Sequence, residues 1–254
     1  MFILAVLRSV EAQYCVPGTY QGTCESVLIV HSADISHAAD VQEKVNGTNS
    51  FTAVDTFDAN FATPTPSHLD AYDTVLVFNN GSFSDATRFG DLLAAYHDKG
   101  GGVVLAFLSG QQERWSDNIS MGAYGTPANG YLILDYVSGN VTSTPESLGD
   151  LLEPESPLLL EVGSLAASLA YRSTAPVING GIVVARWGGG GREPLVVRGV
   201  RGNRTLVELN FYPASSSVDP ALFTGDGAAL MRNALKYSRC MTCRAGTFSF
   251  AGER

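Results

Sequence analysis

Two histidines and an aspartate at regular spacing form the first group of residues that could support chemistry. His31, Asp34 and His37 make a His-x2-Asp-x2-His pattern, and imidazole and carboxylate side chains are common metal ligands. No further carboxylate lies at a spacing that would complete a ligand set. The pattern also describes a polar loop in which Asp34 or Ser36 caps the next helix, and we favour that interpretation over a metal site.

Ser109 is the second candidate, as a nucleophile at the end of a strand. A serine hydroxyl needs a base within hydrogen-bonding distance before it can attack a substrate. Of the four histidines, only His31 and His37 lie near a strand end on the side where a ligand would bind. A serine in this place can equally end the strand and bond to the local backbone. We favour that role because no base is identified.

Polar, uncharged residues that follow three expected strands form the third group. The carboxyl ends of parallel strands border one crevice, and such a crevice suits a small polar ligand such as a sugar or an amide. A protein partner and a merely solvated crevice are the alternatives. No cofactor is expected. The glycines from Gly188 to Gly191 precede a strand and not a helix N-terminus, so they predict a hairpin turn and not a phosphate-binding loop. The crevice residues are Asn79, Asn80, Ser109, Gly110, Gln111, Asn210 and Tyr212.

The elements that would position these residues alternate between strand and helix. Apolar runs are followed by amphipathic stretches with short turns, which predicts right-handed crossovers and a doubly wound, mostly parallel α/β sheet of the flavodoxin-like kind. The expected order is strand Val27–Ser32, helix Ser36–Val45, strand Phe51–Phe57, strand Thr74–Asn80, helix from Ser84 or Asp85 to His97, and strand Val103–Leu108.

The second half of the chain is less regular. Periodicity weakens from Gln111 to Pro176, and three short runs with glycine-rich turns then predict an antiparallel meander at the edge of the sheet. A helix from Asp226 or Gly227 to Tyr237 closes the core. The three runs are Gly181–Trp187, Pro194–Arg198 and Thr205–Phe211.

Charge and hydropathy argue against two classes of partner. The 254 residues carry a formal net charge of −9 without a run of lysine or arginine, so we expect no nucleic-acid binding, which requires a basic surface. No apolar run approaches the roughly 20 residues that span a bilayer. Membrane attachment would therefore need segments outside this chain.

Glycosylation acceptors and cysteines indicate an extracellular or cell-surface location. The Asn-x-Ser/Thr pattern recurs, and the cysteines flank the expected core, as disulfides of extracellular proteins often do. Zinc is the alternative for the cysteines, although knuckle spacing is lacking. Residues 1–12 are either a signal segment or a disordered start. The acceptors are Asn46, Asn80, Asn118, Asn140 and Asn203, and the cysteines are Cys15, Cys24, Cys240 and Cys243.

Five short motifs, taken in their order along the chain, carry a resemblance to a known family. They are Gly100-Gly-Gly, Ser156-Pro-Leu-Leu, Val184-Ala-Arg-Trp, Leu209-Asn-Phe-Tyr-Pro and Thr224-Gly-Asp-Gly. Together they make the chain from Val27 to Tyr237 resemble the class I glutamine amidotransferase-like superfamily, including its trehalose-utilisation-type branch. The resemblance implies one amidotransferase-like α/β domain over residues 26–238.

Catalytic members of that superfamily carry a Cys-x-Gly-x-Gln elbow and a later Phe-His-Pro-Glu run, which supply a nucleophile, a base and an orienting acid. The corresponding runs here are Leu108-Ser-Gly-Gln-Gln and Phe211-Tyr-Pro-Ala. The resemblance thus places Leu108, Tyr212 and Ala214 where the triad would be. Glutamine hydrolysis by the family mechanism is not expected.

The flanking segments 13–25 and 239–254 carry a second resemblance. Tyr14-Cys-Val-Pro-Gly-Thr-Tyr and Cys240-Met-Thr-Cys-Arg-Ala-Gly-Thr-Phe-Ser are similar to pieces of the ephrin-receptor-like cysteine-rich repeat, which implies part of a larger extracellular array. We therefore expect a non-catalytic extracellular binding or structural module. The alternative is a hydrolase that uses Ser109 or a metal at His31, Asp34 and His37.

Overall fold

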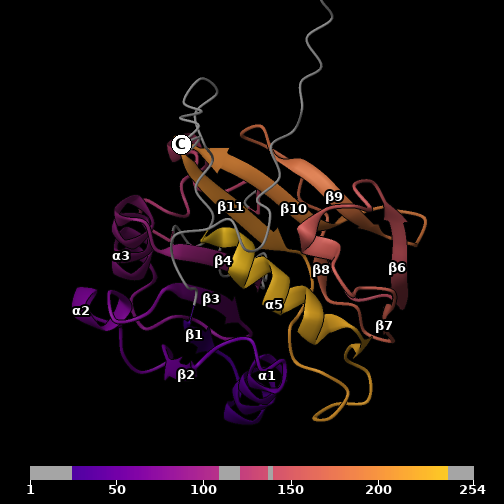
Figure 1. The fold of residues 1–254 in the computed structure, drawn as a ribbon, viewed down its shortest axis with the longest axis horizontal. Helices are drawn as coiled ribbons and strands as arrows, with labels where there is room; N and C mark the ends of the chain where they lie inside the picture. The colour runs from indigo at the N-terminus through magenta and orange to yellow at the C-terminus, as the bar shows by residue number, and fades with distance from the viewer. Residues whose placement is uncertain (1–24, 109–120, 137–139, 240–254) are drawn as a thin grey trace, which may run out of the picture.

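A computed structural model describes residues 25–108, 121–136 and 140–239 of the chain (Figure 1). Within these residues the main sheet has the strand order β12-β7-β6-β9-β10-β11-β4-β3-β1-β2, and β5 and β8 form a separate pair. The strands are β1 Ser26–Ser32, β2 Ala53–Asp58, β3 Thr74–Asn79, β4 Gly102–Leu108, β5 Val141–Thr142, β6 Glu146–Leu151, β7 Leu165–Ala167, β8 Arg172–Ser173, β9 Ile182–Trp187, β10 Pro194–Arg201, β11 Arg204–Leu209 and β12 Thr224–Gly225.

Helices cover both faces of the parallel part of the sheet. One core contains residues of α1 and α5 packed on β1, β3, β4 and β11, and Figure 1 shows α5 in front of β4 and β11. A second core on the opposite face contains residues of α2 and α3 and of the segment 121–136. The helices are α1 Ile35–Gly47, α2 Pro66–Leu69, α3 Ala86–Lys99 and α5 Gly227–Ser238, with short 3-10 turns at Pro127–Asn129 and Pro157–Leu159.

The predicted fold class is confirmed. Strands β2, β1, β3, β4 and β11 run parallel to their neighbours in that order. The central residues of β1, β3 and β4 are apolar and buried, as in doubly wound folds, whereas the edge strand β2 exposes Asp55 and Thr56. The antiparallel meander is confirmed as β9-β10-β11. It does not form the edge of the sheet, however, because β6, β7 and β12 extend the sheet beyond β9.

Local sequence explains where α1 and α3 begin and where α3 ends. Asp34 caps α1, and its side chain accepts a hydrogen bond from the Ser36 backbone N–H at 3.2 Å. Asp85 caps α3 in the same way through the Arg88 N–H at 2.9 Å. Gly100 ends α3 with a φ of 111°, a left-handed conformation that favours glycine. The strand β4 can therefore start directly after this turn.

None of the described helices is long and apolar enough to cross a membrane.

Candidate functional site

The first strand carries a buried histidine one residue before its end, at the carboxyl edge of the parallel strands. His31 pairs with Asp58 of β2 and Phe78 of β3, and its ring stacks on the Phe78 ring at a centroid distance of 5.8 Å. The His31 Nδ1 accepts a hydrogen bond from the Ala33 N–H at 3.3 Å. Burial lowers the pKa of His31, although the Asp58 charge opposes this shift. His31 therefore favours the neutral form and packs within the carboxyl edge of the parallel strands.

The structure does not gather His31, Asp34 and His37 into a metal site. The Asp34 carboxylate is exposed and caps α1, and the Ser36 N–H lowers its pKa. The His37 Nδ1 lies 2.9 Å from the Tyr212 phenolic oxygen. Over the described parts of the chain, no three histidine, cysteine or acidic side chains are placed to share a metal ion. Asp34 has the capping role that the loop interpretation gave it.

Tyr212 lies at the centre of a cluster of rings that includes the His37 side chain. Its ring meets Phe78, His37 and Tyr171 edge-on, at centroid distances of 5.8, 5.7 and 6.2 Å. Burial raises the pKa of Tyr212, and the Asp34 charge adds to the rise. The hydroxyl group therefore stays protonated at neutral pH and can donate its hydrogen to the His37 Nδ1 when that nitrogen is unprotonated.

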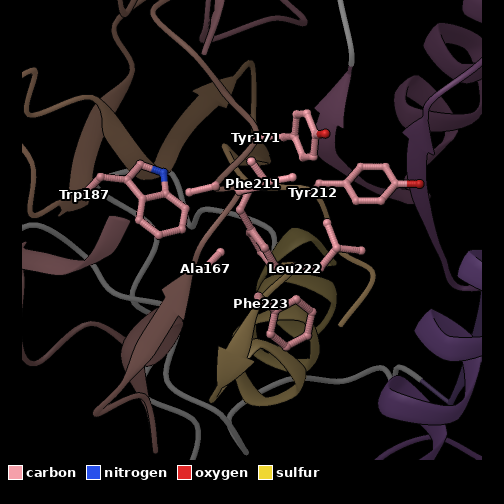
Figure 2. A pocket seen from close by; sticks show the side chains of 9 residues that line it. Ala167, Tyr171, Trp187, Phe211, Tyr212, Leu222 and Phe223 are labelled. Atoms are coloured by element: carbon pink, nitrogen blue, oxygen red, sulfur yellow. The ribbon is translucent and has the colours of Figure 1, made fainter. Parts of the chain in front are cut away.

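A small aromatic pocket opens next to this cluster (Figure 2). About 200 Å³ of space lies in and above it, open solvent included, and its enclosed part has room for about one water molecule. The Trp187 indole N–H donates to the Asn210 backbone carbonyl at 2.9 Å, and Figure 2 shows the hydroxyl groups of Tyr171 and Tyr212 pointing away from Trp187 and Phe223. The wall is therefore mainly, though not wholly, apolar. The lining residues are Ala167, Leu169, Ala170, Tyr171, Trp187, Phe211, Tyr212, Leu222 and Phe223.

The asparagines expected in the crevice have different surroundings. Asn210 is fully buried, and its side chain accepts from the Ser173 N–H at 2.7 Å and donates to the carbonyls of Ser173 and Pro194 at 2.8 Å each. It fastens β8 and β10 together and does not face an opening. Asn79 is buried and donates to the Gly81 carbonyl at 3.0 Å, whereas Asn80 is exposed.

Several expected site residues lie outside the described residues. These are Ser109, Gly110, Gln111, the acceptor Asn118 and the cysteines Cys15, Cys24, Cys240 and Cys243. Leu108 ends β4, and its side chain also lies outside the described part. Ala214, at the place of the orienting acid, is fully buried.

Of the nine residues that line the pocket, sequence reasoning placed only Tyr212 at the site and missed the other eight. Tyr171, Trp187 and Phe223 come from three separate segments with no shared spacing, so no motif connects them. The one available signal was an aromatic residue at the end of an apolar run, as Trp187 is at the end of β9.

Comparisons with known proteins find no match to a family model and none to a curated protein sequence. Solved structures of low sequence identity resemble the fold. A glutamine amidotransferase from Thermotoga maritima is 12% identical with a TM-score of 0.46 over 74% of this chain and 75% of its own. The glutaminase domain of Trypanosoma brucei CTPS, solved with acivicin, is 14% identical with a TM-score of 0.44 over 87% and 98%. The protein SMU.1228c is 11% identical with a TM-score of 0.49 over 84% and 97%.

Proposed function

We propose that this chain is a non-catalytic extracellular or cell-surface binding module, and that the aromatic pocket, whose Tyr212 ring is held from behind by His37, forms its ligand site. The observation that carries the proposal is the state of Tyr212, which is buried among aromatic rings with its hydroxyl group 2.9 Å from the His37 Nδ1. A protonated phenol donates a hydrogen bond and does not accept a proton, so it cannot serve as a general base.

The same strand end offers no second catalytic group. Tyr212 follows β11 where the family resemblance expects a base, and Ala214, two residues later, has no polar side-chain atom to orient one. Nucleophilic catalysis needs a base that is itself held by a third group. These residues support binding over acyl transfer at this strand end.

The pocket chemistry favours an uncharged ligand with an apolar face. Nine apolar or aromatic residues line the pocket, and none of them carries a formal charge. A charged group placed there would lose its hydration without gaining a partner. Aromatic rings pack well against flat apolar surfaces, and a saccharide ring that lies across the mouth of the pocket has such a face. We therefore propose a saccharide ligand.

The chain provides a fluorescence test of this proposal. Its two tryptophans are Trp115 and Trp187, so a Trp115→Phe protein reports from the pocket alone. Titration with a panel of neutral mono- and disaccharides should change the Trp187 emission in a saturable way. Tyr171→Ala should abolish the change, while Phe61→Ala, which removes an aromatic ring that is 87% exposed and outside the pocket, should leave it intact. Equal responses in both variants would contradict the proposed site.

A further inference from the structure

The described asparagines fall into two sets that differ in their side-chain bonding. In the first set every side-chain amide donates a hydrogen bond to a protein oxygen, at distances of 2.7–3.2 Å. These amides tie turns and strands together, so the fold uses them. The set consists of Asn49, Asn60, Asn79, Asn129, Asn179, Asn210 and Asn233.

The second set consists of Asn46, Asn80, Asn140 and Asn203. All four are exposed, and none of their side-chain amides forms a hydrogen bond to another described residue, although exposed members of the first set such as Asn129 and Asn179 do so. Each of the four, and no member of the first set, stands in an Asn-x-Ser/Thr pattern. Free amides and acceptor motifs therefore coincide at the same positions.

We propose that Asn46, Asn80, Asn140 and Asn203 carry N-linked glycans, an inference that rests on the extracellular setting of the proposed function. In this modification the asparagine Nδ2 forms a bond to the anomeric carbon of an oligosaccharide. The bond from that carbon to its diphosphate-lipid carrier breaks, and the amide loses one proton. The acceptor must be an amide that the folded chain can spare and that faces solvent.

The four positions can hold a glycan without loss of a side-chain hydrogen bond to another described residue. Asn46 lies in the last turn of α1, and Asn203 lies in the turn between β10 and β11. Asn80 directly follows β3. Asn140 is held by its backbone, which donates to the Thr174 hydroxyl at 3.0 Å and accepts from the Thr174 N–H at 2.8 Å. Its side chain takes no part in either bond.

Asn203 shows that the order of modification and folding matters. The third residue of its motif is Thr205, which is buried, and the Thr205 hydroxyl donates to the carbonyls of Tyr237 and Ser238 at 2.9 Å each. An enzyme that reads this hydroxyl group cannot reach it in the folded chain. Modification at Asn203 must therefore precede the docking of α5, whereas the exposed Ser82 leaves the motif of Asn80 readable afterwards.

The test is site-by-site glycan mapping of the full chain, secreted from eukaryotic cells behind a heterologous signal sequence. Peptide-N-glycosidase converts each glycosylated asparagine to aspartate, and peptide mass spectrometry locates the conversions. We expect conversion at all four positions and a gel shift that falls stepwise as each is changed to glutamine. Unmodified asparagine at these positions in secreted protein would overturn the inference. This readout is independent of ligand binding, which is measured on unglycosylated protein.

A stability measurement on bacterially expressed protein provides the matched control. The quadruple variant with glutamine at Asn46, Asn80, Asn140 and Asn203 should unfold at the same urea midpoint as the parent. These side-chain amides form no hydrogen bond to another described residue, so none is lost. Asn179→Gln should lower the midpoint, because the Asn179 amide bonds the carbonyls of Pro127 and Leu132. A quadruple variant less stable than Asn179→Gln would show that the fold needs these amides, and would overturn the inference.

Discussion

His37 and Tyr212 meet across 175 residues of sequence, with the His37 Nδ1 2.9 Å from the Tyr212 phenolic oxygen. This bond joins the start of α1 to the end of β11, and it fixes the aromatic cluster that borders the pocket. This hydrogen bond explains why a tyrosine fits after β11. The Tyr212 side chain anchors β11 to α1, and its hydroxyl group has His37 as a partner.

Removal of the Tyr212 hydroxyl group should lower the stability of the protein without unfolding it. Tyr212→Phe keeps the ring and its three aromatic neighbours, so we expect a loss of about 0.5–1.5 kcal/mol in the free energy of unfolding. Urea denaturation measures this loss. Tyr72→Phe is the control, because the Tyr72 hydroxyl bonds Asp55 at an exposed position and should contribute less. A larger loss in Tyr72→Phe would contradict the anchoring role.

Glu208 should make stability fall as the pH rises. It is 1% exposed, and its two carboxylate oxygens accept from the N–H groups of Ile133 and Leu134 at 2.8 and 3.0 Å. Burial raises the pKa of Glu208 from 4.5 to about 8, against the effect of these bonds. The pKa of Glu208 is higher in the folded state than in the unfolded state, so the stabilising contribution of Glu208 is complete below about pH 4.5. This contribution is lost as the pH rises through about 8, by up to about 1.4 kcal/mol per pH unit.

The Glu208→Gln variant isolates this contribution. An amide does not titrate, so the difference in unfolding free energy between parent and variant should change between pH 5 and pH 9, with the parent losing more. The variant should also be less stable at pH 5, because its amide NH2 meets a backbone N–H. Parallel pH profiles for parent and variant would show that Glu208 does not titrate in this range.

Arg172 should contribute strongly to the stability of the fold. It is 3% exposed and pairs with the partly buried carboxylates of Glu146 and Glu193 at 2.9 and 3.2 Å. Arg172→Met leaves both carboxylates without their partner, and we expect a loss of about 3–5 kcal/mol in unfolding free energy. Arg192→Met, which breaks an exposed pair with Asp150, should cost about 1 kcal/mol or less. Similar losses in the two variants would contradict this account.

A glycine in the middle of α3 should not tolerate alanine. A Cβ atom on Gly90 would lie 1.6 Å from the Met121 carbonyl oxygen, because the segment 121–136 packs directly on the helix backbone. Gly90→Ala should therefore destabilise the protein by about 1–3 kcal/mol, although alanine favours helix by about 1 kcal/mol. Gly47→Ala, at the end of α1 with open space around it, should be neutral or stabilising. Thermal melts compare the two.

Much of the parallel part of the fold could be predicted from the sequence. The strands from Val27 and Val103 are continuous apolar runs, and burial on both faces requires such runs. The strands β6 and β7 could not be predicted in the same way. The sequence of β6, Glu-Ser-Leu-Gly-Asp-Leu, lacks alternation, and its partner β9 lies more than 30 residues further along the chain.

The candidate site was harder to predict, because burial decides the role of a polar residue. Asn210 follows an apolar strand and looks like a ligand-binding residue, but its amide binds the backbone of Ser173 and Pro194. Tyr212 was placed at the site by its motif, but its bond to His37 depends on how α1 packs. The pocket depends on Trp187 and Phe223, which only the extended sheet brings together.

The claim that this chain binds a ligand without chemical turnover is tested most directly by a hydrolysis assay. Purified full chain is incubated with glutamine and with chromogenic esters and amides, beside Ser109→Ala and Tyr212→Phe proteins. We predict product release at the rate of buffer alone for all three proteins. Release by the parent that is lost in Ser109→Ala would contradict the account, and would show that a serine hydrolase operates on this fold.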